Sequence, residues 1–313
     1  MNKSILNLLA MCFIALSIVT SCVKDENVVS IPIEETSPTS NLEGVKTKSM
    51  TNWTTVGGKV GNYATIWKHT NKNIYVAQID LVHCNIGMVF AGNGSNSSFT
   101  SEVFKIKTVA DIAASQPSNS FFLMSNSSYF WRDGNLDDRP LTWPLKQGDF
   151  ETLGENYYQK PTTNVGFAEG KELCALIFKP TYGALAVPFS RTDCNNWSAA
   201  KFRGTTKCYV GLYGTGNDAT NKRGRTIVAL KNKEWHGFYS EMLLLVVGDD
   251  TTNGLTETEA KTLLSDFNFT EASDNKIIPF DAGGSSQLYF NGSTKTNVAT
   301  RRVPAAFIVK DGN

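Results

Sequence analysis

The chain has 313 residues, with 30 Lys or Arg against 29 Asp or Glu, so its net charge is close to zero. A neutral chain without a basic stripe argues against a nucleic acid partner, because phosphate binding rests on clusters of Lys and Arg. The sequence holds six cysteines and three histidines, without C-x-x-C spacing among the cysteines of the domain, which argues against a zinc site. We therefore predict no nucleic acid partner and no cofactor or metal.

The N-terminal residues are typical of an exported protein. Lys3 gives a positive start, and residues 5–19 are almost wholly apolar, as in a secretory signal that is too short to span a membrane. Val19-Thr20-Ser21-Cys22 resembles a bacterial lipobox, in which the cysteine is lipidated and becomes the mature N-terminus. An ordinary signal peptide with an incidental cysteine is the alternative. We predict a lipid anchor at Cys22 in the outer membrane of the cell envelope, with surface exposure suggested by the polar residues 23–27.

Three segments divide the chain. Residues 1–21 are the predicted signal peptide, and residues 22–51 are the lipidated cysteine and a flexible tether, because this Ser-, Thr-, Glu- and Pro-rich stretch has too little apolar surface to offset chain entropy. Residues 52–313 are predicted to form one large domain. Within it, Cys194 and Cys208 bracket a loop-like segment and are the favoured disulfide pair, although four cysteines permit three connectivities.

Short apolar or alternating runs rich in Val, Ile and aromatic residues predict strands along this domain. In chain order they are Tyr63–Trp67, Ile74–Val82, Gly87–Ala91, Ser120–Met124, Leu173–Phe178, Tyr209–Tyr213, Thr226–Leu230, Met242–Val247, Lys276–Phe280, Gln287–Phe290 and Ala305–Val309. Helices are predicted at Thr108–Ser115 and at Thr256–Phe267, the second of which opens with a capping box. The pattern predicts an α+β fold with a large mixed or mainly antiparallel β-sheet core and a few flanking helices.

Common catalytic motifs are missing from the sequence. It contains no G-x-S-x-G elbow, Walker loop or H-E-x-x-H. Residues 214–219 match a G-x-G-x-x-A spacing, but residues 220–225 do not begin the apolar helix that dinucleotide binding requires. His69, His83 and His236 lie in or beside strand-like runs without a paired nucleophile, so we expect structural or solvated roles for them.

The most informative segment is Asp281-Ala282-Gly283-Gly284-Ser285-Ser286, between two predicted strands. Adjacent glycines permit backbone conformations in which several N–H groups converge on an anion. An acid beside such a turn is suited to chemistry on a phosphoester. The alternative is a hairpin turn in which Asp281 only accepts hydrogen bonds from the turn.

The order of segments resembles the phosphodiester glycosidase family over about residues 52–310. Four segments carry the resemblance. The Asp281–Ser286 turn is similar to the family's Asp-Gly-Gly-Gly-Ser, and Asn126-Ser127-Ser128-Tyr129-Phe130 is similar to its Asn-Gly-Gly-Phe-Phe. Arg225-Thr226 resembles the start of the family's Arg-Thr-led strand, and Arg302-Val303-Pro304 with the strand after it resembles its closing arginine and final strand. Two departures stand out. Ala282 replaces a glycine, and Ser127-Ser128 replaces a double glycine, which could close space over the substrate.

The resemblance implies a hydrolase that cleaves the bond between sugar C1 and a phosphate oxygen, on envelope or external glycans. It implies that Asp281 acts at C1 as base or nucleophile and that Arg225 binds the phosphate, because its planar fork donates two parallel hydrogen bonds. The remaining implied substrate-binding residues are Asn126, Tyr129, Phe130, Thr226, Asp249, Gly283, Gly284, Ser285 and Ser286. Structural alternatives stay open: Arg225 as an ion-pair partner of Asp249, and Asn126 as a stabiliser of an irregular loop.

A non-catalytic glycan-binding lipoprotein on the same fold is the second hypothesis, and a structural envelope protein is the third. In a glycan binder, Trp131, Trp143 and Trp197 would be exposed platforms for sugars. The loop after Phe130 carries Asp133, Asp137 and Asp138, which we predict to form a solvated rim, although one could supply a second carboxylate.

Overall fold

The computed structural model describes residues 50–58, 63–95, 102–118, 120–130, 137–152, 173–179, 182–189, 193, 207–214, 219–250, 252–270, 275–296 and 301–312. They belong to one compact unit, Thr47–Asn313. The predicted signal peptide, Cys22 and the tether up to residue 49 lie outside the described residues. In the part of the chain that the structure describes, no helix has the length and apolar character needed to cross a membrane.

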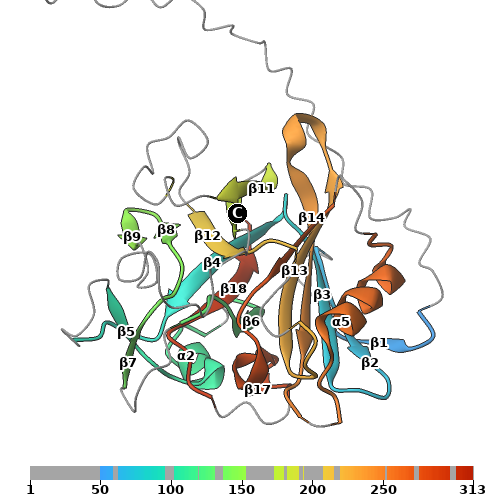
Figure 1. Cartoon of the computed structure of the whole chain (residues 1–313), viewed down its shortest axis with the longest axis horizontal. Helices are drawn as coiled ribbons and strands as arrows, with labels where there is room; N and C mark the ends of the chain where they lie inside the picture. Colours follow the sequence, from blue (N-terminus) through green and yellow to red (C-terminus); the bar gives the residue numbers. More distant parts are fainter. Residues whose placement is uncertain are drawn as a thin grey trace, which may run out of the picture. The chain divides into compact units, whose positions relative to one another are not determined.

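Two antiparallel sheets make up most of this unit (Figure 1). The eleven-stranded sheet runs β1 (Trp53–Gly58), β2 (Ala64–His69), β3 (Ile74–Asp80), β14 (Tyr239–Val247), β11 (Gly183–Phe189), β10 (Leu173–Lys179), β12 (Lys207–Leu212), β8 (Leu145–Gln147) and β9 (Phe150–Thr152), and β13 (Arg225–Lys233) joins β14 to β15 (Lys276–Pro279). The five-stranded sheet runs β17 (Ser293–Thr294), β16 (Leu288–Phe290), β6 (Leu123–Asn126), β18 (Ala305–Asp311) and β4 (Cys84–Phe90). A separate ribbon pairs β5 (Val103–Lys105) with β7 (Asp138–Pro140).

The central strands are apolar on both faces because both faces are covered. On β3, Tyr75, Ala77 and Ile79 face the core between the two sheets. Ile74 and Val76 point the opposite way, into a second apolar cluster. Strand side chains alternate between faces, so a strand buried on both sides needs a nearly continuous apolar run. This explains why the central strands are prominent in the sequence.

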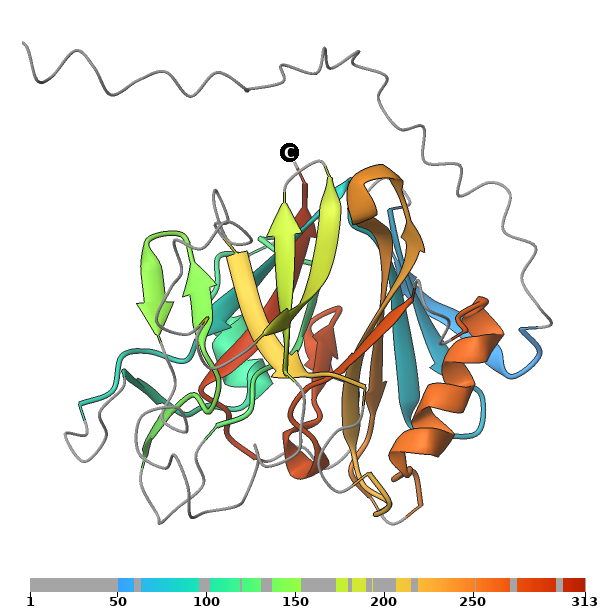
Figure 2. The same cartoon turned by 45° about the horizontal axis from the view of Figure 1, so that its top comes forward.

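One helix covers the outer face of each sheet, which gives four layers in the order helix, small sheet, large sheet, helix (Figure 2). Helix α5 (Glu257–Leu263) and the 3₁₀ turn η4 (Leu264–Phe267) bury their apolar stripe against β3, β13 and β14. Helix α2 (Val109–Ala114) packs against β6 and β18. The layered arrangement leaves the ends of the strands, rather than their faces, as the places where polar side chains from both sheets meet.

The structure confirms a β-rich α+β fold with a large antiparallel sheet and few helices, and every predicted strand overlaps an observed one. The capping box at Thr256 is formed, because the Thr256 hydroxyl accepts from the Glu259 N–H and the Glu259 carboxylate accepts from the Thr256 N–H. The run predicted at Ser120–Met124 pairs two to three residues later, as β6. The sequence did not indicate β1, β5, β7, β8, β9, β11 and β17.

The described cysteines are buried. They are Cys84, Cys174 and Cys208, whereas Cys194, the other half of the favoured disulfide, lies outside the described residues. Cys208 belongs to β12, in an apolar cluster on one face of the large sheet. Burial raises the pKa of the Cys84 and Cys174 thiols to about 12. These thiols therefore serve as small apolar core residues.

Candidate functional site

The Asp281–Ser286 turn joins the two sheets. Strand β15 belongs to the large sheet, and its pairing with β13 continues one residue further, because the Phe280 N–H donates to the Thr226 carbonyl at 2.9 Å. The next N–H, that of Asp281, donates to the Ser127 carbonyl at 3.1 Å, just beyond β6 of the small sheet. The chain then turns through η5 (Gly283–Ser285) and enters β16. Asp281 therefore lies where the ends of both sheets meet.

Two glycines fix the shape of this turn. Gly283 has φ +71°, in the left-handed region that favours glycine, and its N–H donates to the Gly224 carbonyl at 2.9 Å. A β-carbon on Gly224 would lie 2.6 Å from the Gly283 carbonyl oxygen, so the two backbones approach at a distance that only glycine permits. The Ser286 N–H closes the turn by donating to the Gly283 carbonyl at 2.9 Å.

Charged side chains gather against the turn. Around the point that a Gly283 β-carbon would occupy lie Arg301 Nη1 at 3.5 Å, Asp249 Oδ2 at 3.8 Å and Arg223 Nη1 at 4.0 Å. The Arg301 guanidinium also covers Gly284, with Cζ and Nε both 3.3 Å from the position of a β-carbon there. We call Arg223 and Arg301 the arginine pair. Two guanidinium groups beside a glycine turn form an arrangement suited to a phosphate, which arginine recognises through two parallel hydrogen bonds.

Asp281 is half-buried at the start of the turn. Its Oδ1 accepts from the Ala282 N–H at 3.0 Å, and its backbone carbonyl accepts from Asn126 Nδ2 at 2.9 Å. The contact with Ala282 is the turn-capping interaction that was the structural alternative for this residue. Asp249, the other carboxylate of the cluster, accepts from the Gly224 N–H through Oδ1 at 2.6 Å, which holds Gly224 against the turn.

Asn126 and Thr226 form the scaffold under the site. The Asn126 side chain is fully buried, and its Oδ1 accepts from the Thr226 hydroxyl at 2.7 Å and from the Gln287 N–H at 3.0 Å. With Nδ2 donating to Asp281, one amide ties together β6, β13 and both ends of the turn. The predicted contact of Asn126 with a sugar gives way to the structural role, and Thr226 shares that role.

Arg225 points into a different environment from the one predicted. It is 3% exposed, its Nε donates to the Leu255 carbonyl at 3.0 Å, and its Nη2 donates to the Asn221 carbonyl. These bonds hold the loops at the start of β13 and before α5. Arg302, the predicted closing arginine, forms an exposed ion pair with Asp137 at 3.0 Å.

The sequence pattern pointed to Arg225 and Arg302 and did not indicate the arginine pair. Arg301 precedes Arg302, and Arg223 precedes Arg225 by two residues. The available signal was a second arginine beside each predicted one. For Arg301 and Arg302 the choice depends on the local backbone direction, because successive side chains of an extended chain point to opposite sides. For Arg223 and Arg225, which are two residues apart, it depends on the local course of the backbone around Gly224.

Three serine hydroxyls beside Asp281 are buried. Ser127, Ser285 and Ser286 are 1%, 0% and 1% exposed, and within the part of the chain that the structure describes their Oγ atoms have no hydrogen-bond partner. Ser285 and Ser286 were predicted to bind substrate because they belong to the Asp281–Ser286 turn. Ser127 was noted only as a departure from a glycine.

The predicted aromatic contacts lie in the core instead. Tyr129 and Phe130 are 4% and 8% exposed and belong to two different apolar clusters. Trp143 is fully buried and packs edge-on against Tyr129 at a centroid distance of 6.4 Å, so it is not an exposed platform for sugars. Trp131 and Trp197 lie outside the described residues.

The residues of the predicted acidic rim differ in their exposure to solvent. Asp137 is exposed, whereas Asp138 is buried between Lys105, at 2.7 Å from Oδ1, and the Ser95 N–H. The hydrogen bond from Lys105 and then the bond from the Ser95 backbone lower the pKa of the Asp138 carboxyl. Asp138 thus stabilises the β5–β7 ribbon rather than forming part of a solvated rim, and Asp133 lies outside the described residues.

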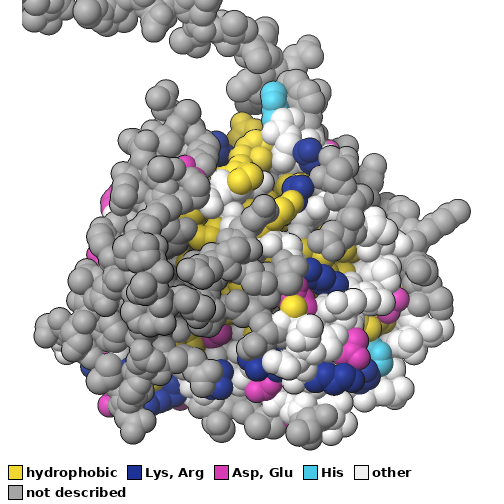
Figure 3. Space-filling view, in the orientation of Figure 1, with side chains coloured by type: hydrophobic (Ala, Val, Ile, Leu, Met, Phe, Trp, Pro, Cys, Tyr) yellow, Lys and Arg dark blue, Asp and Glu magenta, His cyan; other side chains and the backbone are white. Residues whose placement is uncertain are grey.

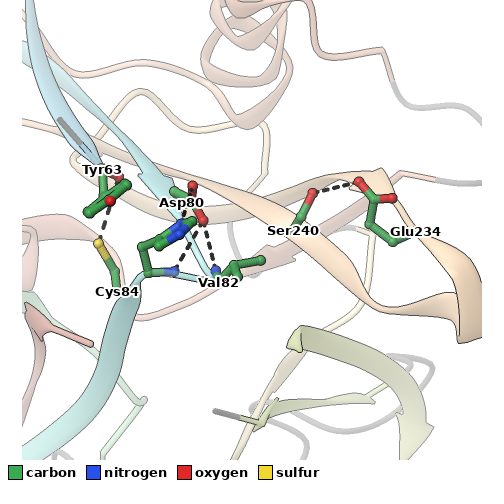
Figure 4. A network of polar contacts seen from close by, with 7 residues as sticks. Tyr63, Asp80, Val82, Cys84, Glu234 and Ser240 are labelled. Atoms are coloured by element: carbon green, nitrogen blue, oxygen red, sulfur yellow. Dashed lines mark hydrogen bonds and ion pairs between the residues drawn. The ribbon is translucent and has the colours of Figure 1, made fainter. Parts of the chain in front are cut away.

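A second polar cluster contains His83 and has a structural explanation (Figure 4). The buried Asp80 carboxylate accepts from the Val82 N–H at 2.8 Å and lies 2.9 Å from His83 Nδ1. The His83 ring stacks on Tyr63 with centroids 4.0 Å apart, and the Cys84 thiol points to the Tyr63 carbonyl. These contacts cap the turn between β3 and β4.

The other histidines also have local surroundings. His69 accepts from the Asn71 N–H and packs edge-on against Trp53, and burial lowers its pKa. His236 is exposed at φ +66° in a turn. The described residues hold no group of three or more His, Cys, Asp or Glu side chains placed to bind a metal ion. On the face shown in Figure 3, acidic and basic side chains lie interspersed over the described surface.

Comparison with known proteins leaves the family open. No protein-family model and no curated protein matches this chain. The crystal structure of a hypothetical protein from Synechocystis is similar to it, with a TM-score of 0.43 and 11% sequence identity, over 83% of this chain and 62% of that chain. This chain thus spans less than two thirds of that protein's length, and a likeness at this TM-score carries no argument about fold or function.

Proposed function

We propose that the chain is a hydrolase of sugar 1-phosphodiesters with a phosphodiester glycosidase-like fold. The observation that carries the proposal is the meeting of Asp281, the Gly283–Gly284 turn and the arginine pair at one point between the two sheets. This set provides a carboxylate for the sugar carbon and cationic donors for the phosphate. The resemblance of the turn sequence to the family supports the same assignment.

The chemistry suits this set of groups. The group that leaves C1 is a phosphomonoester, the anion of a fairly strong acid, so its departure needs less protonation than that of an ordinary glycosidic oxygen. The site must stabilise negative charge on the phosphate and provide a base or nucleophile for the oxocarbenium-like carbon. In the proposal the arginine pair binds the phosphate in place of Arg225, the turn's N–H groups assist, and Asp281 acts at C1. No metal or cofactor is part of this mechanism.

The proposed setting is the bacterial envelope. The lipobox-like sequence supports a lipid anchor at Cys22, which would hold the domain at the outer membrane on a flexible tether. There it would meet carbohydrate phosphodiesters on envelope or external glycans, and no nucleic acid partner is proposed.

A non-catalytic glycan-binding protein is the second candidate. The observation that favours it is the bond from the Ala282 N–H to Asp281 Oδ1, which gives this carboxylate a turn-capping role that needs no chemistry. Ser127-Ser128, in place of a double glycine, is also compatible with lost activity on a retained fold.

Turnover by the purified chain separates the two candidates. The chain is incubated with a panel of sugar 1-phosphodiesters, N-acetylglucosamine-1-phosphomethyl-mannose among them, and release of reducing sugar is measured. Asp281→Asn should lower the rate by at least about 100-fold, the contribution typical of a group that acts directly on the reacting atoms. Asp311→Asn, at an exposed position at the end of β18, is the matched control and should keep the wild-type rate. No release from any substrate, with retained glycan binding, would favour the binding protein.

A further inference from the structure

Ser127, Ser285 and Ser286 present an unusual set of buried hydroxyls. Each is at least 99% buried, and among the described residues none has a hydrogen-bond partner for its Oγ. Most buried polar groups in proteins are hydrogen-bonded, so each such atom needs an explanation. Ser125, two residues before Ser127, shows the ordinary case, since its equally buried hydroxyl donates to the Asn126 carbonyl at 2.9 Å.

The three hydroxyls belong to two facing segments. Strands β6 and β16 pair antiparallel with Ser125 opposite Leu288, and the bond from the Asn126 N–H to the Gln287 carbonyl continues this pairing. The next position in the same register sets Ser127 opposite Ser286. Ser127 and Ser286 therefore lie on neighbouring segments, just beyond the paired ends of β6 and β16.

This position is next to the charged groups of the site. The Ser127 carbonyl accepts from the Asp281 N–H, which places Ser127 next to the backbone of Asp281. Ser286 lies on the other side, with its β-carbon 3.0 Å from the point that a Gly224 β-carbon would occupy, next to Asp249. Ser127 and Ser286 thus each lie next to a residue of the candidate site, Asp281 and Gly224 respectively.

The kind of donor indicates which part of a ligand belongs here. A guanidinium only donates hydrogen bonds, which matches a phosphate oxygen, whereas a serine hydroxyl both donates and accepts. Sugar hydroxyls have the same dual character. We propose that Ser127 is a specificity-determining residue that hydrogen-bonds a hydroxyl of a hexose 1-phosphate unit whose phosphate lies against Arg301 and Arg223. This proposal takes the location of the site from the proposed function, but it does not require that the chain hydrolyse the bound sugar phosphate.

Equilibrium binding of two probes tests this assignment. Titration calorimetry measures the affinity of the purified chain for glucose 1-phosphate and for inorganic phosphate. Ser127→Ala should weaken the affinity for glucose 1-phosphate by about tenfold, because one hydrogen bond is lost, and should change the affinity for inorganic phosphate by less than about twofold. Ser125→Ala, which removes an equally buried hydroxyl that already has a partner, should leave both affinities unchanged. Thermal unfolding confirms that each variant is folded, and Ser127→Gly provides a second removal of the hydroxyl.

Several results would overturn the assignment. Equal weakening of both probes would make Ser127 a phosphate contact, and unchanged affinities would remove it from the site. If the wild-type chain did not bind glucose 1-phosphate, the proposal that the site binds a hexose 1-phosphate unit would be wrong. Binding that depends on Ser127 without hydrolysis of any phosphodiester would contradict the proposed function and leave this inference standing.

Discussion

Gly284 and the Arg301 guanidinium lie so close together that the glycine has a defined role. A β-carbon at position 284 would be 3.3 Å from Arg301 Cζ and Nε, which is closer than ordinary van der Waals contact. The backbone of Gly284 does not lie in the left-handed region, so alanine would displace the guanidinium without straining the chain. The requirement for glycine here is therefore about placing an arginine rather than about turning the backbone.

We predict that Gly284→Ala weakens the binding of inorganic phosphate at least fivefold, a loss of about 1 kcal/mol, while the free energy of unfolding changes little. Gly292→Ala is the matched control. Gly292 has φ +75° with no atom within 4 Å of a β-carbon, so alanine there should cost about 1 kcal/mol of stability and leave phosphate binding intact. Calorimetry and urea unfolding of both variants measure the two quantities. Unchanged phosphate affinity in Gly284→Ala would remove Arg301 from the anion site.

Among the elements, α5 is the one whose start is most clearly written in the sequence. The Thr256 hydroxyl accepts from the Glu259 N–H at 3.1 Å, and the Glu259 carboxylate accepts from the Thr256 N–H at 2.8 Å. This backbone bond and then the side chain of Lys222 lower the pKa of Glu259. Both bonds satisfy N–H groups that a helix leaves without partners in its first turn.

We predict that Thr256→Ala destabilises the domain by about 1 kcal/mol, the typical cost of losing an N-cap side chain. Thr258→Ala is the control, because Thr258 is exposed in the first turn and its side chain does not cap the helix. It should change stability by less than about 0.5 kcal/mol. Urea unfolding followed by circular dichroism gives both values. Equal losses would show that the capping box does not contribute to stability.

Burial on both faces decided which strands the sequence could indicate. Strands β3, β13, β14 and β18 are long apolar runs between two covered faces, and all were predicted. Strands β5, β7, β8 and β9 have three residues each, too few for a period to appear. Strand β11 contains Pro188, which argues against a strand in the sequence, although it is compatible with the sparse pairing of β11 to β14.

The topology brings the candidate site together from segments that are far apart in the sequence. Its residues come from the end of β6, the start of β13, the loop after β14, the turn after β15 and the segment before β18. Through the resemblance to a family, the sequence pointed to all five segments, with Asp249 in the loop after β14. It could not predict which arginine turns toward Gly283. Arg301 and Arg302 are adjacent, and one residue step along an extended chain reverses the direction of the side chain. Arg223 and Arg225 lie two residues apart, so their directions depend on the local backbone around Gly224.

Core packing likewise limited the prediction of binding residues. Asn126, Tyr129 and Phe130 were placed in the site by the pattern of their segment, yet the structure commits the first to scaffold hydrogen bonds and the other two to apolar clusters. The same types of polar and aromatic residue occur beside such a turn whether they face a ligand or support the turn. Only the direction of each side chain separates the two roles.

In the proposed function the chain breaks the bond between sugar C1 and the phosphate oxygen, with the arginine pair on the phosphate and Asp281 at the sugar. Hydrolysis in oxygen-18-labelled water, followed by mass spectrometry of the phosphomonoester product, tests it most directly. We expect a phosphomonoester without the label, because water adds to the sugar carbon. A labelled phosphomonoester would show attack at phosphorus, which would contradict the glycosidase and make the protein a phosphodiesterase.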